Sequence, residues 1–231
     1  MNEPKQYWPI DSQTKEVLLA QIAQYRGGMY HIPSNVLTEQ PRQMKEGFAV
    51  IATFNDGAPI GTEYISDHRG ETIYNTNNGM ESKIVSELGE IKEGWTTLKP
   101  LPYSIWEAGS WEQKVTLLLN AKRTEINQWR YSEEADETQT VSLIGTDWDA
   151  GPSARSRIDS TLLTGQMPPY WTDANNVDHE GMTLEELKQV KIAISERGFA
   201  IHDRQRTMKI EVEALTDFDE ILNYPVGWPQ S

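Results

Sequence analysis

Two aspartates, Asp147 and Asp149, flank Trp148 and are the residues whose types and spacing best suit chemistry. A pair of carboxyl groups is what glycosidases use to protonate a leaving group and to attack or activate water, and an aromatic ring gives a sugar a surface to stack on. A tryptophan between two aspartates equally fits a turn whose ring folds back into the core. We expect the core interpretation. A receptor-binding or carbohydrate-binding and carbohydrate-degrading tip module, using Trp148 and Trp171, is the alternative.

The segment from Asp173 to Glu180 resembles a calcium-binding loop. An EF-hand loop needs oxygen ligands at its first, third and fifth positions, a glycine at the sixth and a glutamate at the twelfth. Asp173 and Asn175 fit this pattern, but Val177, Asp178 and Leu184 occupy the other three positions. We expect a polar hairpin turn, and whether it binds a cation stays open.

No other arrangement of residues predicts an active site. The chain has no cysteine, and its four histidines do not occur at the spacing of a metal site. It also lacks the glycine-rich and serine motifs of nucleotide-binding proteins and hydrolases. We therefore expect no enzymatic activity, no cofactor and no metal. The histidines are His31, His68, His179 and His202.

Composition narrows the class of partner. The 231 residues carry a net charge of −14, which disfavours nucleic acid and anionic membranes as partners. The longest strongly apolar stretch, 115–119, is far shorter than the roughly 20 residues that span a bilayer. The N-terminus shows no secretory signal. We expect a soluble protein made in a cytoplasm, with two modest cores rich in aromatic residues.

The sequence pattern of the N-terminal half predicts a meander of short strands. Residues 14–25 predict a short helix that Gly27-Gly28 ends. Strands are expected over 29–33, 48–54, 58–65, 71–75 and 82–85, with a hairpin at Asn55-Asp56-Gly57. The prolines in residues 94–102 predict an extended linker.

From Ser110 the hydrophobic period becomes helical. Ser110 and Gln113 predict a capping box for a helix that runs to about residue 135. An alternating strand over 140–146, a turn over 147–151, a helix to about residue 163 and a strand over 170–172 follow. Thr183 and Glu186 form a second capping box, for a helix that continues through Gly198 to about residue 215. The predicted class is α+β: a small N-terminal β-meander region, then a C-terminal helix–hairpin–helix module.

The C-terminal residues resemble an uncharacterised domain that is common in bacteriophage tail and tail-fibre proteins. The resemblance covers about residues 112–229. It rests on these spaced strings: Trp129-Arg130, Ile144-Gly145, Trp148-Asp149, Arg155 to Ile158, Trp171 to Asn175, Met182 to Leu187, His202 to Arg206, Lys209, Val212 to Leu215 and Gly227-Trp228-Pro229.

A second resemblance covers about residues 29–106. The strings Tyr30–Ser34, Ile65–Tyr74 and Lys92–Pro100 are similar to segments of phage tail-fibre assembly proteins. Residues 1–28 resemble no known family, and we assign them as an N-terminal attachment segment. The predicted domains are therefore 1–28, 29–106 and 110–231.

The resemblance implies a non-enzymatic tail protein that binds a tail fibre or baseplate protein, as an assembly chaperone or as a small structural subunit of the virion. It implies a place in the host cytoplasm during assembly or in the virion tail, and a homo-oligomer that matches a trimeric fibre. Two further expectations are that residues 110–231 fold autonomously and that partner binding lies chiefly in residues 1–106. The candidates for structural or interaction roles are Trp95, Trp129, Trp148, Trp171, Arg204, Arg206 and Trp228.

Overall fold

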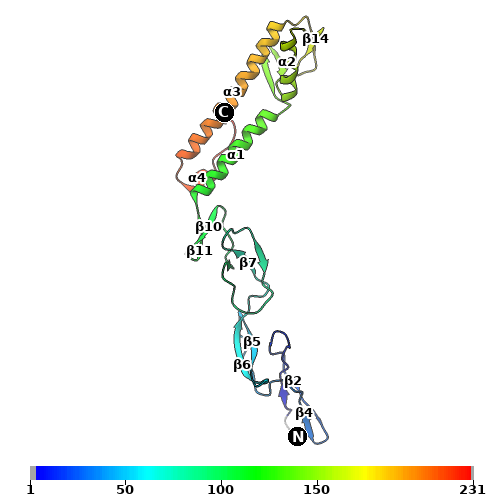
Figure 1. Ribbon diagram of the computed structural model, residues 1–231, viewed down its shortest axis with the longest axis vertical. Helices are drawn as coiled ribbons and strands as arrows, with labels where there is room; N and C mark the ends of the chain where they lie inside the picture. Colours follow the sequence, from blue (N-terminus) through cyan, green and yellow to red (C-terminus); the bar gives the residue numbers. More distant parts are fainter. Residues whose placement is uncertain (1–3, 230–231) are drawn as a thin grey trace. The chain divides into compact units, whose positions relative to one another are not determined.

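The computed structural model describes residues 4–229, and the chain divides into two compact units, Met1–Gln113 and Lys114–Ser231 (Figure 1). The first three residues of the predicted attachment segment and the last two of the predicted C-terminal module lie outside the described residues. The fold is α+β, as predicted, with its helices in the second unit. No helix in residues 4–229 is long and apolar enough to cross a membrane.

The N-terminal unit consists of short antiparallel strands. The central hairpin is formed by β5 and β6, which turn at Asp56-Gly57, where both residues have positive φ. The largest sheet in the described part of this unit has three strands, in the order β8-β7-β9. The strands are β1 (Gln6–Tyr7), β2 (Gln21–Ile22), β3 (Gln24–Arg26), β4 (Met29–His31), β5 (Phe48–Asn55), β6 (Ala58–Ser66), β7 (Thr72–Asn75), β8 (Ser82–Ile84), β9 (Trp95–Thr96), β10 (Ser104–Glu107) and β11 (Ser110–Gln113).

The predicted helix over residues 14–25 is wrong. This stretch contains β2 and the start of the β3–β4 hairpin. Gly27 and Gly28, expected to end a helix, are instead the two central residues of that hairpin turn, with φ of 59° and 86°. A two-residue turn with positive φ at both positions matches the twist of a hairpin, and glycine adopts it without steric cost.

The predicted capping box at Ser110 is also wrong. Ser110 to Gln113 form β11, which pairs with β10 across a turn at Ala108-Gly109. The strand buries Trp111, whose indole N–H donates to the Leu98 carbonyl at 2.8 Å. The predicted linker over 94–102 therefore lies against Trp111, and it contributes β9 to the three-stranded sheet.

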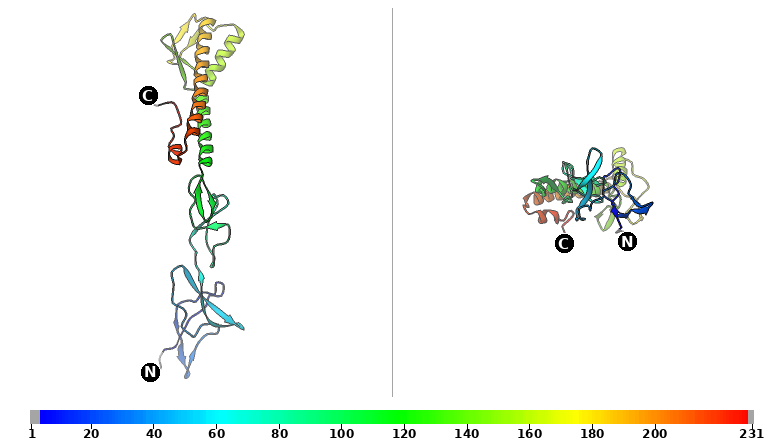
Figure 2. Two further views of the ribbon diagram at one scale, coloured as in Figure 1. Left: turned by 90° about the vertical axis from the view of Figure 1, so that its left-hand side faces the viewer. Right: turned by 90° about the horizontal axis from the view of Figure 1, so that it is seen from below.

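The C-terminal unit is built on two antiparallel helices, α1 (Val115–Ala135) and α3 (Leu184–Ala214), which run side by side (Figure 2). Ion pairs join them near both ends: Arg123 lies 2.9 Å from Glu213, and Arg197 lies 3.4 Å from Glu133. The remaining elements are β12 (Thr140–Leu143), β13 (Thr146–Asp149), α2 (Pro152–Thr164), β14 (Tyr170–Thr172), β15 (Asp178–Glu180) and α4 (Phe218–Leu222).

Two apolar clusters hold this unit together, one toward each end of α3. The first joins the β12–β13 hairpin and α2 to the start of α3. The second joins α1, the end of α3 and α4. The buried members of the first are Val141, Trp148, Ala150, Ile158, Leu187, Val190 and Ile194, and those of the second are Leu118, Ile126, Met208, Val212 and Ile221.

Local signals mark the helix ends of this unit. Thr183 and Glu186 form the predicted capping box of α3. Gly165 ends α2 in the left-handed conformation, and Asp217 caps α4. The helix α3 continues through Gly198. The predicted turn over 147–151 is wrong, because residues 146–149 form β13 and the hairpin turns earlier, at Ile144-Gly145.

Candidate functional site

The side chain of Trp148 points into the core. The residue is 7% exposed and belongs to the first apolar cluster, where its ring lies 5.0 Å from the His179 ring. A buried ring offers no face to a sugar. The core interpretation of Trp148 is therefore confirmed, and Trp171, which is half-buried, packs against the same cluster.

Asp147 and Asp149 lie on the opposite face of β13, because side chains alternate along a strand. Each carboxylate has a partner within the unit. The hydroxyl of Ser142, directly across the hairpin, donates to Asp147, and Arg157 lies 3.9 Å from Asp149. These partners give the two carboxylates a local role in the hairpin and at its contact with α2.

The carboxylate of Asp173 organises the turn between β14 and β15. It accepts hydrogen bonds from the backbone N–H groups of Asn175 and Val177 and lies 2.9 Å from Nε2 of His179. The interaction with His179 and the N–H of Val177 hold the pKa of Asp173 below its usual value. Between residues 4 and 229, no cluster of three or more histidine and carboxylate side chains could hold a metal ion.

Three tryptophan candidates make contacts within their own units. The Lys83 ammonium lies 4.0 Å from the centre of the Trp95 ring. Trp129 and Trp228 pack edge to face at 5.4 Å, and the Trp228 indole donates to Glu133. The C-terminal segment is thereby fastened to α1.

The two arginine candidates differ in their surroundings. Arg204 donates to the Gly227 carbonyl at 2.7 Å and pairs with Glu211 at 3.1 Å, so it also fastens the C-terminal segment. Arg206 is exposed on the side of α3 that faces away from the core. Arg204 is accounted for by these internal contacts, whereas Arg206 is presented to solvent.

An exposed apolar site lies in the N-terminal unit. An open groove of about 420 Å³ is lined by residues 16–20, Pro41, Arg42 and Met44, and it also includes Trp8 and the start of β5; we call it the Leu18–Met44 groove. Its apolar lining is strongly exposed, since Leu19 is 83% and Met44 is 93% exposed. Large apolar side chains gathered at one exposed place are typical of a protein-binding site.

One wall of this groove is fixed by backbone pairing and by an ion cluster. The Val17 N–H donates to the Val50 carbonyl, which attaches this wall to β5. The Arg69 guanidinium donates to Glu16 at 2.7 and 2.8 Å and to Asp67 at 2.7 and 2.8 Å. These hydrogen bonds hold the pKa of both carboxyls below their usual values and raise the pKa of Arg69.

The other wall is held by β6. The Arg42 side chain donates to the Thr62 carbonyl at 2.8 Å, its backbone N–H donates to the Thr62 hydroxyl, and the Tyr64 hydroxyl donates to the Gln43 carbonyl. These bonds hold the backbone next to Met44 in place. The groove therefore combines fixed walls with an exposed apolar lining, a combination that suits docking of an apolar segment of a partner.

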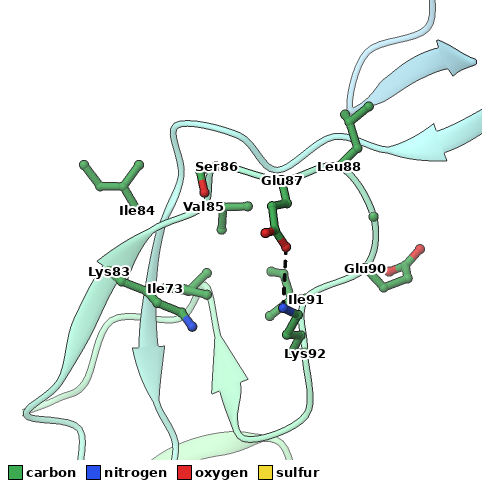
Figure 3. Close-up of a pocket in the computed structure, with 11 residues that line it drawn as sticks. Ile73, Lys83, Ile84, Val85, Ser86, Glu87, Leu88, Glu90, Ile91 and Lys92 are labelled. Carbon is green, nitrogen blue, oxygen red and sulfur yellow. Dashed lines mark hydrogen bonds and ion pairs between the residues drawn. The ribbon is translucent and has the colours of Figure 1, made fainter. Parts of the chain in front are cut away.

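A second hollow in this unit has a different character. It lies beneath the loop 85–92 and beside β7 and β8, and Figure 3 shows Ile73, Val85 and Ile91 at its centre. Lys92 and Glu87, on its rim, form an ion pair at 3.5 Å. The loop is tied down where the Ser66 hydroxyl donates to Glu90 at 2.5 Å. We interpret this hollow as the inside of a structural loop.

The Leu18–Met44 groove was not predictable from local sequence patterns. Arg69 lies in the string Ile65–Tyr74, but it reaches Glu16 across 53 positions of the chain. The predicted helix over residues 14–25 includes the exposed pair Leu18-Leu19 and is incompatible with the position of this pair beside β5. The unusual run of large apolar residues near a polar N-terminus was the signal that could have pointed to the groove.

Comparison with known proteins relates the chain to a domain of unknown function and to tail fibre assembly proteins. A family described as a domain of unknown function (DUF4376) matches residues 118–224, within the segment where a phage tail domain was predicted. The chain is 36% identical over 159 residues to the "Prophage tail fiber assembly protein homolog TfaE" of Escherichia coli strain K12, which covers 68% of this chain and 69% of that protein. No solved structure matches the chain.

Two further relatives carry similar names. A "Tail fiber assembly protein homolog" of Escherichia coli is 34% identical over 120 residues, or 52% of each chain. The "Tail fiber assembly protein" of Escherichia phage lambda is 30% identical over 109 residues, which are 47% of this chain and 50% of the lambda protein. The match therefore spans about half the length of these two proteins.

Proposed function

We propose, from the premise that this chain belongs to the family of tail fibre assembly proteins, that it binds a tail fibre protein through the Leu18–Met44 groove and catalyses no reaction. The observation that carries the proposal is the exposed apolar lining of a groove whose walls are fixed by hydrogen bonds. The chain acts in the host cytoplasm during assembly. Whether it remains in the virion tail would be decided by mass spectrometry of purified virions.

The chemistry of the described residues supports binding over catalysis. Asp147 and Asp149 are engaged within the hairpin and by α2, Asp173 organises a turn, and Trp148 is buried. The carbohydrate-binding or carbohydrate-degrading alternative would use Asp147, Asp149, Trp148 and Trp171, and Trp171 packs against the first apolar cluster. A tail protein that binds another protein needs none of them to be free.

The groove suits an apolar, extended or β-rich segment of a fibre protein. Leu18, Leu19, Met44 and Phe48 supply apolar contacts, and methionine adapts its shape to different partners. The charged cluster around Arg69 lies at the same groove and contributes a polar boundary. A fibre chain exposes such segments before it has assembled, when its strand edges are unpaired.

The proposal is tested by co-expression with a tail fibre protein from the same genome. We expect the tagged full-length chain to purify with the fibre protein, and the fragment 114–231 to purify alone. The fragment itself should remain folded, because it contains both apolar clusters of its unit. Circular dichroism of the fragment checks this point.

Retention of the fibre protein by the fragment 114–231 would place the binding site in the C-terminal unit and contradict the proposal. Failure of the full-length chain to bind any fibre or baseplate protein would contradict it as well. Hydrolysis of host polysaccharide that requires Asp147 or Asp149 would replace it with the carbohydrate-degrading alternative.

A further inference from the structure

The helix α3 carries a second regular stripe on the side opposite its core face. The stripe residues follow one another at spacings of four, three, four, three and four, which is the spacing of a helix–helix contact. On a helix of 3.6 residues per turn they lie opposite Ile194, Ile201 and Met208, which are buried. The residues of this outer stripe are Ile192, Glu196, Phe199, Asp203, Arg206 and Ile210.

The outer stripe is exposed along its whole length. Phe199 is 73% exposed, and Ile192 and Ile210 are also among the exposed large apolar residues. An open hollow runs beside Phe199, His202 and Arg206. Among the described interactions, Glu196 and Arg206 have no ion pair within the unit, whereas Arg204, on the same helix, pairs with Glu211.

We propose that α3 pairs with α3 of a second copy of this chain, antiparallel, about a two-fold axis at the level of Ile201. The order of the outer stripe carries this inference: when the stripe is reversed, isoleucine meets isoleucine, Glu196 meets Arg206, and Phe199 meets Asp203 at the centre. Ile192 then lies level with Ile210 of the second copy, and Glu196 lies level with Arg206 of the second copy. A two-fold interface requires such self-complementarity, in which each contact occurs twice.

At the centre of this interface Phe199 lies level with Asp203 of the second copy, so two aromatic rings and two carboxylates alternate there. In the antiparallel register the two copies of Phe199 are offset by four residues, or about 6 Å along the helix axis at 1.5 Å per residue. Ring centres at about 4.5–7 Å pack favourably edge to face or offset. Phe199 would thus occupy the middle of the contact, where substitutions have their largest effects.

The charges favour a second copy over other occupants. Each copy has a net charge of −14, so association of two copies needs an interface in which local charges are complementary. Glu196 and Arg206 provide that complementarity twice, without a third partner. A parallel arrangement would instead bring Glu196 beside Glu196 and Arg206 beside Arg206.

Sedimentation velocity on the full-length chain over a range of concentrations tests the pairing. We expect a dimer for the wild type and a dissociation constant about 100-fold higher for Phe199→Glu. Leu163→Glu, at a residue of α2 that is 88% exposed, is the matched control and should leave the dimer unchanged. Glu196→Arg and Arg206→Glu should each raise the dissociation constant about 10-fold or more, and the double variant should restore the wild-type value.

Cross-linking tests the register directly, because the chain has no cysteine. On oxidation, an Ile192→Cys protein mixed with an Ile210→Cys protein should form a disulfide-linked dimer. Neither protein alone should form one efficiently, since the two copies of the same position lie far apart in the antiparallel pair.

A wild-type chain that is monomeric at its highest soluble concentration would overturn the inference. So would a dimer that survives Phe199→Glu and both charge reversals, or one in which Ile192→Cys links efficiently to itself. The inference stands apart from the proposed function, since Phe199→Glu should leave capture of the fibre protein intact.

Discussion

Replacement of Trp148 by alanine is expected to lower the free energy of unfolding of the C-terminal unit by about 3–5 kcal/mol. Trp148 is the largest buried side chain of the first apolar cluster, in which it packs with Val141 and Ile158. Its removal leaves a cavity between the β12–β13 hairpin, α2 and α3, and hydrogen-bonded strands cannot close that cavity completely. The His179 ring, 5.0 Å away, also loses its neighbour.

Urea unfolding followed by the helical signal in circular dichroism measures this effect. Leu163→Ala is the control, because Leu163 is exposed on α2 and its truncation should change stability by no more than about 0.5 kcal/mol. A Trp148→Ala protein with wild-type stability that has lost binding to a host glycan would instead support the receptor-binding alternative.

Replacement of Gly151 by alanine is expected to destabilise the same unit by about 3 kcal/mol. A Cβ atom at this position would lie 2.6 Å from Cα of Glu137 and 2.8 Å from its carbonyl oxygen, so the backbone itself would have to move. Gly151 is buried at the start of α2, where the Glu137 carboxylate accepts hydrogen bonds from the backbone N–H and hydroxyl of Ser153. The shift would therefore disturb these contacts as well.

Gly198→Ala provides the matched control with an effect of opposite sign. Gly198 lies within α3, and a Cβ added there meets nothing within 4 Å. Alanine loses less conformational freedom than glycine on forming a helix, so this variant should gain about 0.5–1 kcal/mol. Thermal unfolding of the two variants measures both effects, and a destabilised Gly198→Ala beside an unaffected Gly151→Ala would contradict the packing described here.

Local signals predicted the C-terminal unit well because its helices are long and their ends are marked by specific residues. The capping box at Thr183 and the apolar spacing along α3 specify that helix without tertiary information. The same kind of reasoning failed at Ser110, where a serine followed by a glutamine three residues later fits both a helix start and a strand. Pairing with β10 and burial of Trp111 decide between the two, and both depend on residues outside the segment.

The N-terminal unit was predictable where strand-forming residues or a turn specified it, as at β4, β7 and β8. Asp56-Gly57 identified the β5–β6 hairpin, because residues of this type favour positive φ at such a turn. Residues 14–25 contain no such residues, and their structure depends on contacts with segments far along the chain, such as the pairing of Val17 with Val50. Periodicity within a short segment cannot report contacts of this kind.

The candidate interaction residues show a similar limit. Their types were informative, since Trp129, Arg204 and Trp228 all take part in fastening the C-terminal segment. The sequence did not show whether each side chain would form its hydrogen bonds and ion pairs within the unit or would remain exposed to solvent. That distinction separates Arg204 from Arg206, two positions away, because the two lie on different faces of α3.

The Leu18–Met44 groove is the proposed binding site, and its most direct test is the affinity of a groove variant for the tail fibre protein. Leu19→Asp combined with Met44→Asp places two charges in the apolar lining at positions that are exposed in the free protein, so folding should not change. We expect the dissociation constant of the fibre complex, measured by calorimetry, to rise about 100-fold or more. The melting temperature should stay at the wild-type value, and the control Leu163→Asp should bind normally. Wild-type affinity in the groove variant would contradict the account.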